Sequence, residues 1–311
     1  MDTPFFSIIT PSFERAAMIS EAVDSVLAQG YPDFEHIIVD GASKDDTLVI
    51  LARYPHLRII SEPDCGMYDA INKGLHLARG EIIGLLNTDD LYAVGCFNAV
   101  AEVFQQNPEA MAVVGGVSTF TDRLKVRIKL SDIPPIEADE LWYRLIQGHP
   151  VTNAWFFRRE VFERVGYFDD HYRYAADRFF LIRTALDGNI RPVPIHKVLY
   201  HYRQHKGSVT FSALDSRMPE SGNIRMKVLQ EDVKALDEFL ARPVLPGEVR
   251  RRMRREHSER CYRLTVTGLY HHHWRLALIS SWQGLRRNFL WPLIFSEMAI
   301  HRLQKEVRGH D

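Results

Sequence analysis

The stretch from Ile60 to Tyr92, ISEPDCGMYDAINKGLHLARGEIIGLLNTDDLY, decides how the chain is organised. Its apolar run GEIIGLL predicts a buried strand that ends directly in Asn87-Thr88-Asp89-Asp90. In an open α/β sheet, ligands bind beyond the carboxyl ends of the strands. Two neighbouring carboxylates there suit a hard divalent cation such as Mg2+ or Mn2+. A second interpretation remains open, in which Asp89 and Asp90 cap a helix that starts at Leu91-Tyr92.

Polar residues also end the strands predicted before this stretch. We expect strands at 5–10, 36–40, 57–61 and 81–86, with Pro11-Ser12-Phe13 breaking the first, and helices near 19–27, 46–53 and 68–77. This alternation predicts a parallel sheet with helices on both faces. The polar strand ends then share one edge, and a ligand-binding crevice explains them better than separate caps and turns.

Later segments extend this pattern. We expect helices at 95–106 and 141–147, strands at 111–116, 154–157 and 190–202, and an exposed hairpin within 119–130. Neither G-x-G-x-x-G after the first strand nor G-x-x-x-x-G-K-[ST] occurs. Phosphate must therefore be held in another way, and a diphosphate near Asp89 and Asp90 needs an intervening cation.

Charge divides the 311 residues into two parts. Residues 1–212 carry 21 Lys and Arg against 28 Asp and Glu, whereas residues 213–311 carry 18 against 12. With 46% apolar residues the chain can build a sizeable core. The two parts therefore have different partners or different surroundings.

Cysteine usage and the N-terminus favour a cytoplasmic protein. Cys65, Cys96 and Cys261 are widely spaced, which argues against a disulfide framework and a cysteine zinc site. The segment MDTPFFSIITPSF lacks the basic and apolar regions of a secretory signal. No run of about 18 apolar residues occurs in the sequence.

Four motifs in combination resemble family 2 glycosyltransferases of the GT-A fold, and most closely the bacterial members that build surface polysaccharides. The motifs are PSFER (11–15), IIVDGASKDDT (37–47), EPDCGMYDAINKGLHLARGEIIGLLNTDD (62–90) and FFRREVFERVGYFDDHYRYAADRFFLIR (156–183). The resemblance covers about residues 4–212. It implies a Rossmann-like, mixed and mainly parallel α/β sheet in a catalytic domain, 1–212, followed by a basic helical extension, 213–311.

The resemblance also implies how the nucleotide-sugar donor is bound. The stretch that holds the base and ribose matches Thr10, Pro11, Phe13 and Glu14. Asp40 matches the acid that hydrogen-bonds the base, often uracil, and Gly41 replaces a second Asp of many relatives, which leaves the base preference open. The segment that lines the nucleotide-sugar pocket matches Asp64, Asp69, Asn72 and Lys73. A solvated helix lysine explains Lys73 equally well.

The metal and the catalytic base follow from the same resemblance. Asp89 and Asp90 match the D-x-D-like motif that binds Mn2+ or Mg2+, with Asp90 as the first choice for the ligand and Asp89 nearer the ribose or donor sugar. Asp177 matches the general base that deprotonates the acceptor hydroxyl. Ala176 replaces the Glu that many relatives carry before this base. The alternative for Asp177 is a helix N-cap.

Two further segments have open interpretations. YRQHKGSVT (202–210) resembles the closing loop of the family, so we expect Arg203 and His205 to contact phosphate or metal, with Ser208 assisting; a basic surface loop is the alternative. His149 either faces the acceptor or is a buried structural histidine.

The extension after residue 212 has two explanations. Its arginine cluster at 250–255 and its tryptophans, Trp274, Trp282 and Trp291, suit docking on an anionic membrane surface. Alternatively, it forms a helical bundle that packs on the catalytic domain or on a second subunit.

These observations predict an inverting, metal-dependent glycosyltransferase. It would move a sugar from a nucleotide diphosphate, with UDP favoured, to a hydroxyl of a glycan or lipid-linked acceptor in polysaccharide biosynthesis. It would work in the cytoplasm or at the inner face of the plasma membrane, without nucleic acid, and a homo-oligomer is left open. The rivals are an inactive carbohydrate-binding scaffold and a sugar nucleotidyltransferase, although the latter requires a Gly-rich basic loop that PSFER does not provide.

Overall fold

The computed structural model describes residues 3–123, 126–137, 140–147, 151–205, 208 and 221–287. They belong to two compact units, Met1–His205 and Lys206–Asp311. The predicted boundary at 212/213 lies outside the described residues.

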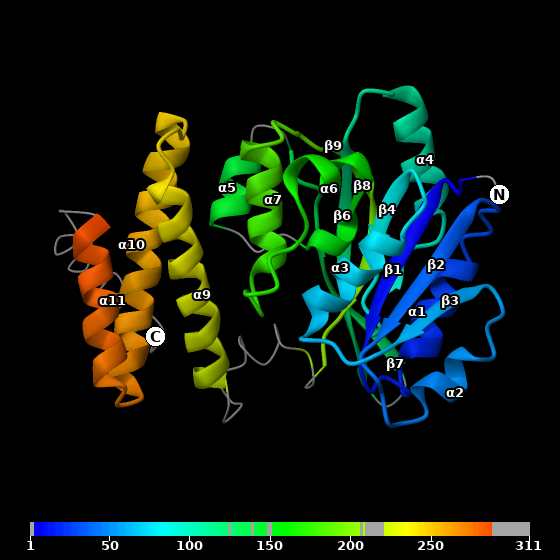
Figure 1. The fold of residues 1–311 in the computed structure, drawn as a ribbon, viewed down its shortest axis with the longest axis horizontal. Helices are drawn as coiled ribbons and strands as arrows, with labels where there is room; N and C mark the ends of the chain where they lie inside the picture. Colours follow the sequence, from blue (N-terminus) through cyan, green and yellow to red (C-terminus); the bar gives the residue numbers. More distant parts are fainter. Residues whose placement is uncertain are drawn as a thin grey trace. The chain divides into compact units, whose positions relative to one another are not determined.

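The elements of the first unit (Figure 1) are β1 Phe6–Ser12, α1 Ile19–Leu27, β2 Phe34–Asp40, α2 Thr47–Leu51, β3 Leu57–Ser61, α3 Met67–Leu77, β4 Ile82–Leu85, β5 Leu91–Tyr92, α4 Cys96–Gln106, β6 Ala112–Arg123, β7 Val126–Ile133, α5 Leu141–Ile146, the 3-10 helix η1 Thr152–Ala154, β8 Trp155–Arg158, α6 Glu160–Val165, α7 Ala176–Leu186 and β9 Val193–Arg203.

A mixed sheet forms the first unit. Its strand order is β3-β2-β1-β4-β8-β6-β9-β5, and β7 pairs with β6. The four strands β1 to β4 are mutually parallel, as the alternation of strands and helices predicts. The short strand β8 is antiparallel to both β4 and β6. Since β8 enters the sheet at the edge where β4 ends, η1, which precedes it, lies at that same edge.

The first strand is longer than predicted. Pro11 and Ser12 continue β1 and pair with Val39 and Asp40 of β2. Ser12 accepts a hydrogen bond from Gly41 on the β2 side, so the missing N–H of Pro11 points to the other side of the strand. There β4 has already ended, since its pairing with β1 stops at Leu85. Proline therefore costs no ladder hydrogen bond at this position.

Helices cover both faces of the sheet because apolar residues occupy successive positions of the central strands. On one face Phe6, Ile8 and Phe156 pack with α4 and α1, which contribute Phe97 and Val26. On the other face α3 lies so close to β1 that a Cβ at Gly74 would stand 2.4 Å from Ile9 Cγ2, and Phe157 contacts α6 and α7 through Phe162 and Phe180.

The helix-cap interpretation of Asp89 and Asp90 is wrong. Leu91 and Tyr92 form β5, which pairs with His201 and Tyr200 of β9, and α4 begins only at Cys96. The two aspartates therefore directly precede a strand of the sheet. The expected hairpin within 119–130 is present as the antiparallel pair β6–β7, although β6 runs to Arg123, well beyond the predicted end at Gly116.

The second unit is helical. It consists of α9 Ser221–Ala241, α10 Gly247–Tyr270 and α11 Trp274–Arg287, and α10 packs against both other helices (Figure 1). Its apolar core comprises Met226, Leu229, Val233, Cys261, Tyr262 and Leu264. Beside this core Arg260 pairs with Asp232 and Glu256, and all three are almost fully buried. Every helix in the described part of the chain is too short or too polar to cross a lipid bilayer.

Candidate active site

Two turns in the left-handed region follow the first two strands. Glu14 has φ 52° after β1, and Ala42 has φ 61° after β2. Ser43 links them, since its hydroxyl accepts the backbone N–H of Glu14 at 2.8 Å. Non-glycine residues in this region cost about 1–3 kcal/mol each and concentrate at ligand sites. The side chain of Phe13 is 55% exposed between these turns, which is unusual for a large apolar residue beside a central strand.

Thr10 and Asp40 lie in the sheet itself. Thr10 is fully buried, and its Oγ1 is 2.9 Å from Nε2 of His36. Asp40 is also fully buried, and it accepts hydrogen bonds from the backbone and hydroxyl of Ser43 and from the hydroxyl of Ser61. Burial lowers the pKa of His36 to about 3, so this imidazole is neutral. Thr10 and Asp40, both predicted to bind the nucleotide, therefore make their hydrogen bonds inside the sheet and fix the ends of its strands.

Asp64 fills the space beside Gly41. A Cβ at Gly41 would lie 2.6 Å from Asp64 Oδ2 and 3.2 Å from the ring of Phe13. Asp64 is itself fixed by the backbone N–H of Gly66, 2.9 Å from Oδ1. The acid that many relatives carry at position 41 is thus replaced by a carboxylate from the next strand end. The ring of Phe13 and the carboxylate of Asp64 both lie beside Gly41, where the resemblance predicts the nucleotide base.

The three predicted residues of α3 make contacts within the protein. Asp69 accepts the N–H of Cys65 at 2.9 Å and pairs with Lys73 at 3.4 Å. Lys73 also pairs with Glu62 at 2.9 Å, a hydrogen bond that raises its pKa. Asn72 donates to the carbonyl of Phe168 at 2.8 Å and accepts its N–H at 3.1 Å. These contacts fasten two loops to α3, the loop that precedes it and the loop that follows α6.

Asp90 is a buried carboxyl with protein donors on both oxygens. Oδ1 accepts the N–H of Arg203 at 2.7 Å, and Oδ2 accepts the hydroxyl of Tyr200 at 2.8 Å and the amide of Asn87 at 3.3 Å. Burial, followed by the charge of Asp89, raises the pKa of Asp90 to about 8. The Tyr200 contact depends on the β5–β9 pairing, which no local pattern indicates.

Asp89 differs from its neighbour because it reaches the surface. Its Oδ2 lies 2.9 Å from Nε2 of His205, and each of the two side chains is 19% exposed. Burial acts to raise the pKa of Asp89, but the hydrogen bond and charge of His205 and the charge of Arg15 outweigh it, so the pKa lies below its ordinary value. The structure therefore brings together Asp89 and His205, which are 116 residues apart in the sequence.

Arg203 is enclosed by carboxylates. Its side chain is 7% exposed and pairs with Glu21 of α1 and Asp122 of β6, while Nε donates to the backbone oxygen of Asp89 at 2.8 Å. A guanidinium compensated by two acids is a weak partner for phosphate, in contrast to the sequence prediction. Glu21 and Asp122 were missed because they come from distant segments. Ser208 is buried, and His149 lies outside the described residues.

Asp177 is a partly buried carboxyl in the first turn of α7. The helix cap is Ala175, so the N-cap interpretation of Asp177 is wrong. Its Oδ1 accepts the N–H of Arg178 at 2.7 Å, and its Oδ2 lies 3.3 Å from the hydroxyl of Thr152 in η1. Burial raises the pKa of Asp177, although bonds from Arg178, Tyr68 and Thr152 oppose the rise. Through Thr152, Asp177 is tied to the sheet edge at which β4 ends.

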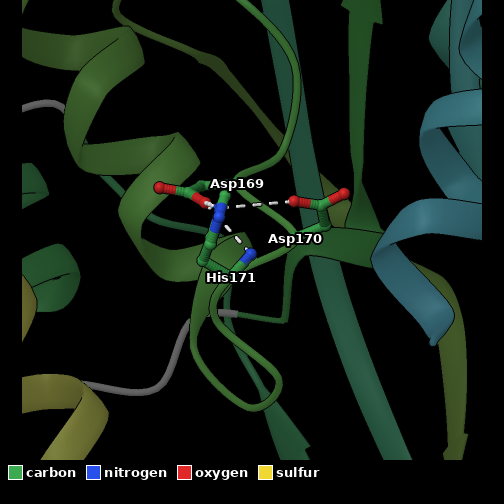
Figure 2. A group of neighbouring side chains, drawn as sticks. All are labelled: Asp169, Asp170 and His171. Atoms are coloured by element: carbon green, nitrogen blue, oxygen red, sulfur yellow. Dashed lines mark hydrogen bonds and ion pairs between the residues drawn. The ribbon is translucent and has the colours of Figure 1, made fainter. Parts of the chain in front are cut away.

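A further group of ionisable side chains lies on the loop before α7. Figure 2 shows Asp169, Asp170 and His171, with His171 Nδ1 3.0 Å and 3.5 Å from oxygens of the two acids. Two of the side chains are exposed and the third nearly so. Solvated ion pairs within one loop account for this group.

Comparisons with known proteins show the family of this chain. The family model for Glycosyl transferase family 2 matches residues 7–166. A PGL/p-HBAD biosynthesis glycosyltransferase of Mycobacterium tuberculosis (strain ATCC 25177 / H37Ra) is 28% identical over 254 residues, which are 79% of this chain and 96% of that protein.

Two solved structures share the fold. The mannosyltransferase PcManGT from Pyrobaculum calidifontis, in complex with GDP-Man and Mn2+, has a TM-score of 0.58 at 19% identity. The match covers 98% of this chain and 82% of the PcManGT chain. S. aureus TarS 1–349, in complex with UDP-GlcNAc, has a TM-score of 0.57 at 15% identity. The match covers 95% of this chain and 92% of the TarS chain. The predicted GT-A fold class is confirmed. Since the family model spans half of the chain, the protein belongs to glycosyl transferase family 2 and is a glycosyltransferase.

Proposed function

We propose that the protein transfers a sugar, with inversion, from a nucleoside diphosphate donor to a hydroxyl of a glycan or lipid-linked acceptor in surface polysaccharide or glycolipid biosynthesis. One observation carries this proposal. The pKa values of two carboxyl groups at the same sheet edge are shifted in opposite directions. The pKa of Asp89 is lowered and that of Asp177 is raised. Such divergence suits one acid for binding a cation and the other for exchanging a proton.

The contact between Asp89 and His205 fits a divalent cation. The two side-chain atoms are 2.9 Å apart at the sheet edge, so Asp89 and His205 would hold a divalent cation together. A carboxylate and an imidazole suit Mn2+ better than Mg2+, which prefers oxygen alone. This supports Asp89 and His205 as the ligands.

Asp90 was the first choice from sequence, but its hydrogen bonds favour the reverse order. Both of its oxygens are engaged by Arg203, Tyr200 and Asn87. We propose that Asp90 holds the strand end in place, so that Asp89 points outward. Arg203 has the same task, since its Nε fixes the backbone oxygen of Asp89.

Asp177 is proposed to act as the general base. Its carboxylate takes the proton of the acceptor hydroxyl as that oxygen attacks the anomeric carbon, and the bond from this carbon to the diphosphate breaks on the opposite face. The configuration therefore inverts, and no second carboxylic acid is needed. When bound, the divalent cation neutralises charge on the departing diphosphate. Thr152 and Tyr68 orient the base.

A uridine nucleotide is the proposed donor. Phe13 offers an exposed ring on which a base can stack, and Asp64 offers an acceptor for the N–H of uracil beside Gly41. Among the proteins of similar fold, TarS has been solved with UDP-GlcNAc and PcManGT with GDP-Man. A carboxylate and an aromatic ring can also bind guanine, so UDP and GDP are compared directly below.

Calorimetric titration of UDP, GDP and dTDP, each with and without Mn2+, tests this function. We expect UDP to bind with Mn2+ and Asp89→Asn to weaken this binding by about 10² to 10³, since a direct ligand is lost. Asp90→Asn should weaken it by about 10 to 10² through misplacement of Asp89. The matched control is Asp170→Asn on the exposed loop. A well-folded protein that binds none of the nucleotides would be the inactive scaffold.

A further inference from the structure

The last helix, α11, has two faces of different character. Its buried face consists of the small residues Ala277, Ser280 and Gly284. Ser280 Oγ lies 2.8 Å from Thr265 Oγ1 of α10, and a Cβ on Gly268 would stand 3.4 Å from Ala277 Cβ. Small residues thus attach α11 closely to α10, and Leu276 packs against the core of the unit. Other large side chains of α11 lie outside this contact.

The large apolar residues of α11 form a stripe in solvent. At about 100° per residue, Trp274, Leu278, Trp282 and Leu285 fall within an arc of about 80°. They are exposed by 60%, 73%, 66% and 42% respectively. A soluble helix normally turns such a stripe to its core. Here the stripe faces away from the buried contact, so it is available to a partner.

The surroundings of the stripe are basic. Arg275 and Arg286 are exposed along one side of it, and neither has an ionic partner among the residues that the structure describes. No acidic residue occurs anywhere between Glu259 and Glu297 in the sequence. An anionic partner therefore complements this surface.

We propose that this surface of α11 docks on an anionic lipid bilayer. A helix with tryptophan and leucine on one face and arginines at its margin lies in the interface of such a membrane, its apolar face among the upper acyl chains. A second copy of the chain is a poorer partner, because pairing two such helices would bring their arginines together without any acid. Nucleic acid would leave the four apolar side chains in water. The proposal adds a partner to the transfer reaction and does not depend on it.

Flotation of the full chain with phosphatidylcholine vesicles, with and without phosphatidylglycerol, tests the proposal. We expect the wild type to float with the anionic vesicles only. Leu278→Glu should reduce the bound fraction at least about tenfold, since it puts a charge among the acyl chains. Arg275→Gln/Arg286→Gln should weaken binding by about fivefold per arginine.

The matched control is Val244→Glu, which makes the same change of charge at an exposed aliphatic residue between α9 and α10. It should float like the wild type. The proposal would be overturned if Val244→Glu and Leu278→Glu lost vesicle binding equally. It would also be overturned if the wild type stayed at the bottom of the gradient with both kinds of vesicle. A wild-type dimer by light scattering that Leu278→Glu converts to monomer would overturn it as well. Nucleotide titration of Leu278→Glu should match the wild type, which separates this outcome from failure of the proposed reaction.

Discussion

The strand ends of the catalytic unit and the helices of the second unit distribute their charged and apolar groups differently. In the catalytic unit, Asp89 and His205 reach the surface at the edge of an apolar sheet, and aromatic side chains such as Phe97 and Phe156 lie inside. In the second unit, the ion group of Arg260, Asp232 and Glu256 is buried. There the exposed face of α11 carries tryptophan and leucine instead.

This difference separates two kinds of binding. A polar edge held by an apolar sheet selects a small charged ligand at fixed geometry. An apolar helix face with basic margins selects a surface by area and charge, without fixed geometry. From this contrast we expect the exposed pair to serve ligand binding and the buried ion group to hold α9 and α10 together. Three substitutions test it, and the largest effect is expected in the catalytic unit.

Asp177→Asn should lower kcat by about 10² to 10⁴, since an amide cannot accept the acceptor proton. Binding of UDP should remain unchanged, because Asp177 is expected to act on the acceptor. Burial raises the pKa of Asp177, so the wild-type rate should fall with decreasing pH at values above those of an ordinary aspartate. Initial rates against pH, with Asp170→Asn as the control, measure both effects. A normal rate in Asp177→Asn would refute its role as the base.

Arg260→Met should destabilise the second unit by about 3–5 kcal/mol, because it removes the cation that lies against two buried carboxylates. Urea unfolding followed by circular dichroism measures the change. Arg263→Met is the matched control, since Arg263 is half exposed on the same helix and should change stability by about 0.5 kcal/mol at most. Similar values for the two variants would show that the buried ion group does not hold α9 and α10 together.

Trp282→Gln should change the free energy of unfolding by no more than about 0.5 kcal/mol, as an exposed side chain does. Leu264→Ala, in the apolar core of the same unit, should cost about 2–5 kcal/mol. The same urea experiment compares them. A loss of more than about 1.5 kcal/mol in the free energy of unfolding for Trp282→Gln would mean that this face of α11 is packed in the free protein. The proposed docking of α11 on a lipid bilayer would then lose its main observation.

Much of the fold follows from local patterns in the sequence. The alternation of apolar strands and amphipathic helices up to residue 86 predicts the four parallel strands, because each element is encoded in consecutive residues. The pairing of Leu91-Tyr92 with β9 was not predictable, since two residues carry no periodicity and their partner lies more than a hundred positions away. The same lack of pattern led to the helix-cap alternative for Asp89 and Asp90.

The candidate site was predictable in its residue types but less so in its contacts. The motifs predict roles for Asp89, Asp177 and His205, but the contacts that support these residues were missed. Thr152 supports Asp177 only because β8 runs antiparallel to β4, and Asp122 reaches Arg203 only because β6 extends beyond its predicted end. Arg203 illustrates the limit, because a sequence shows that a residue is charged but not that neighbouring acids already compensate it.

The position of Arg203 has a consequence for how the enzyme becomes active. It joins Asp89 and Glu21, which precede it by 114 and 182 residues, and its backbone provides a donor to Asp90. Contacts across such separations form late in folding, because long loops must close before they are made. A chain that has formed its parallel strands but has not yet paired β9 therefore lacks the contacts that hold Asp89 and Asp90. Enzymatic activity thus reports the completion of folding as well as the chemistry.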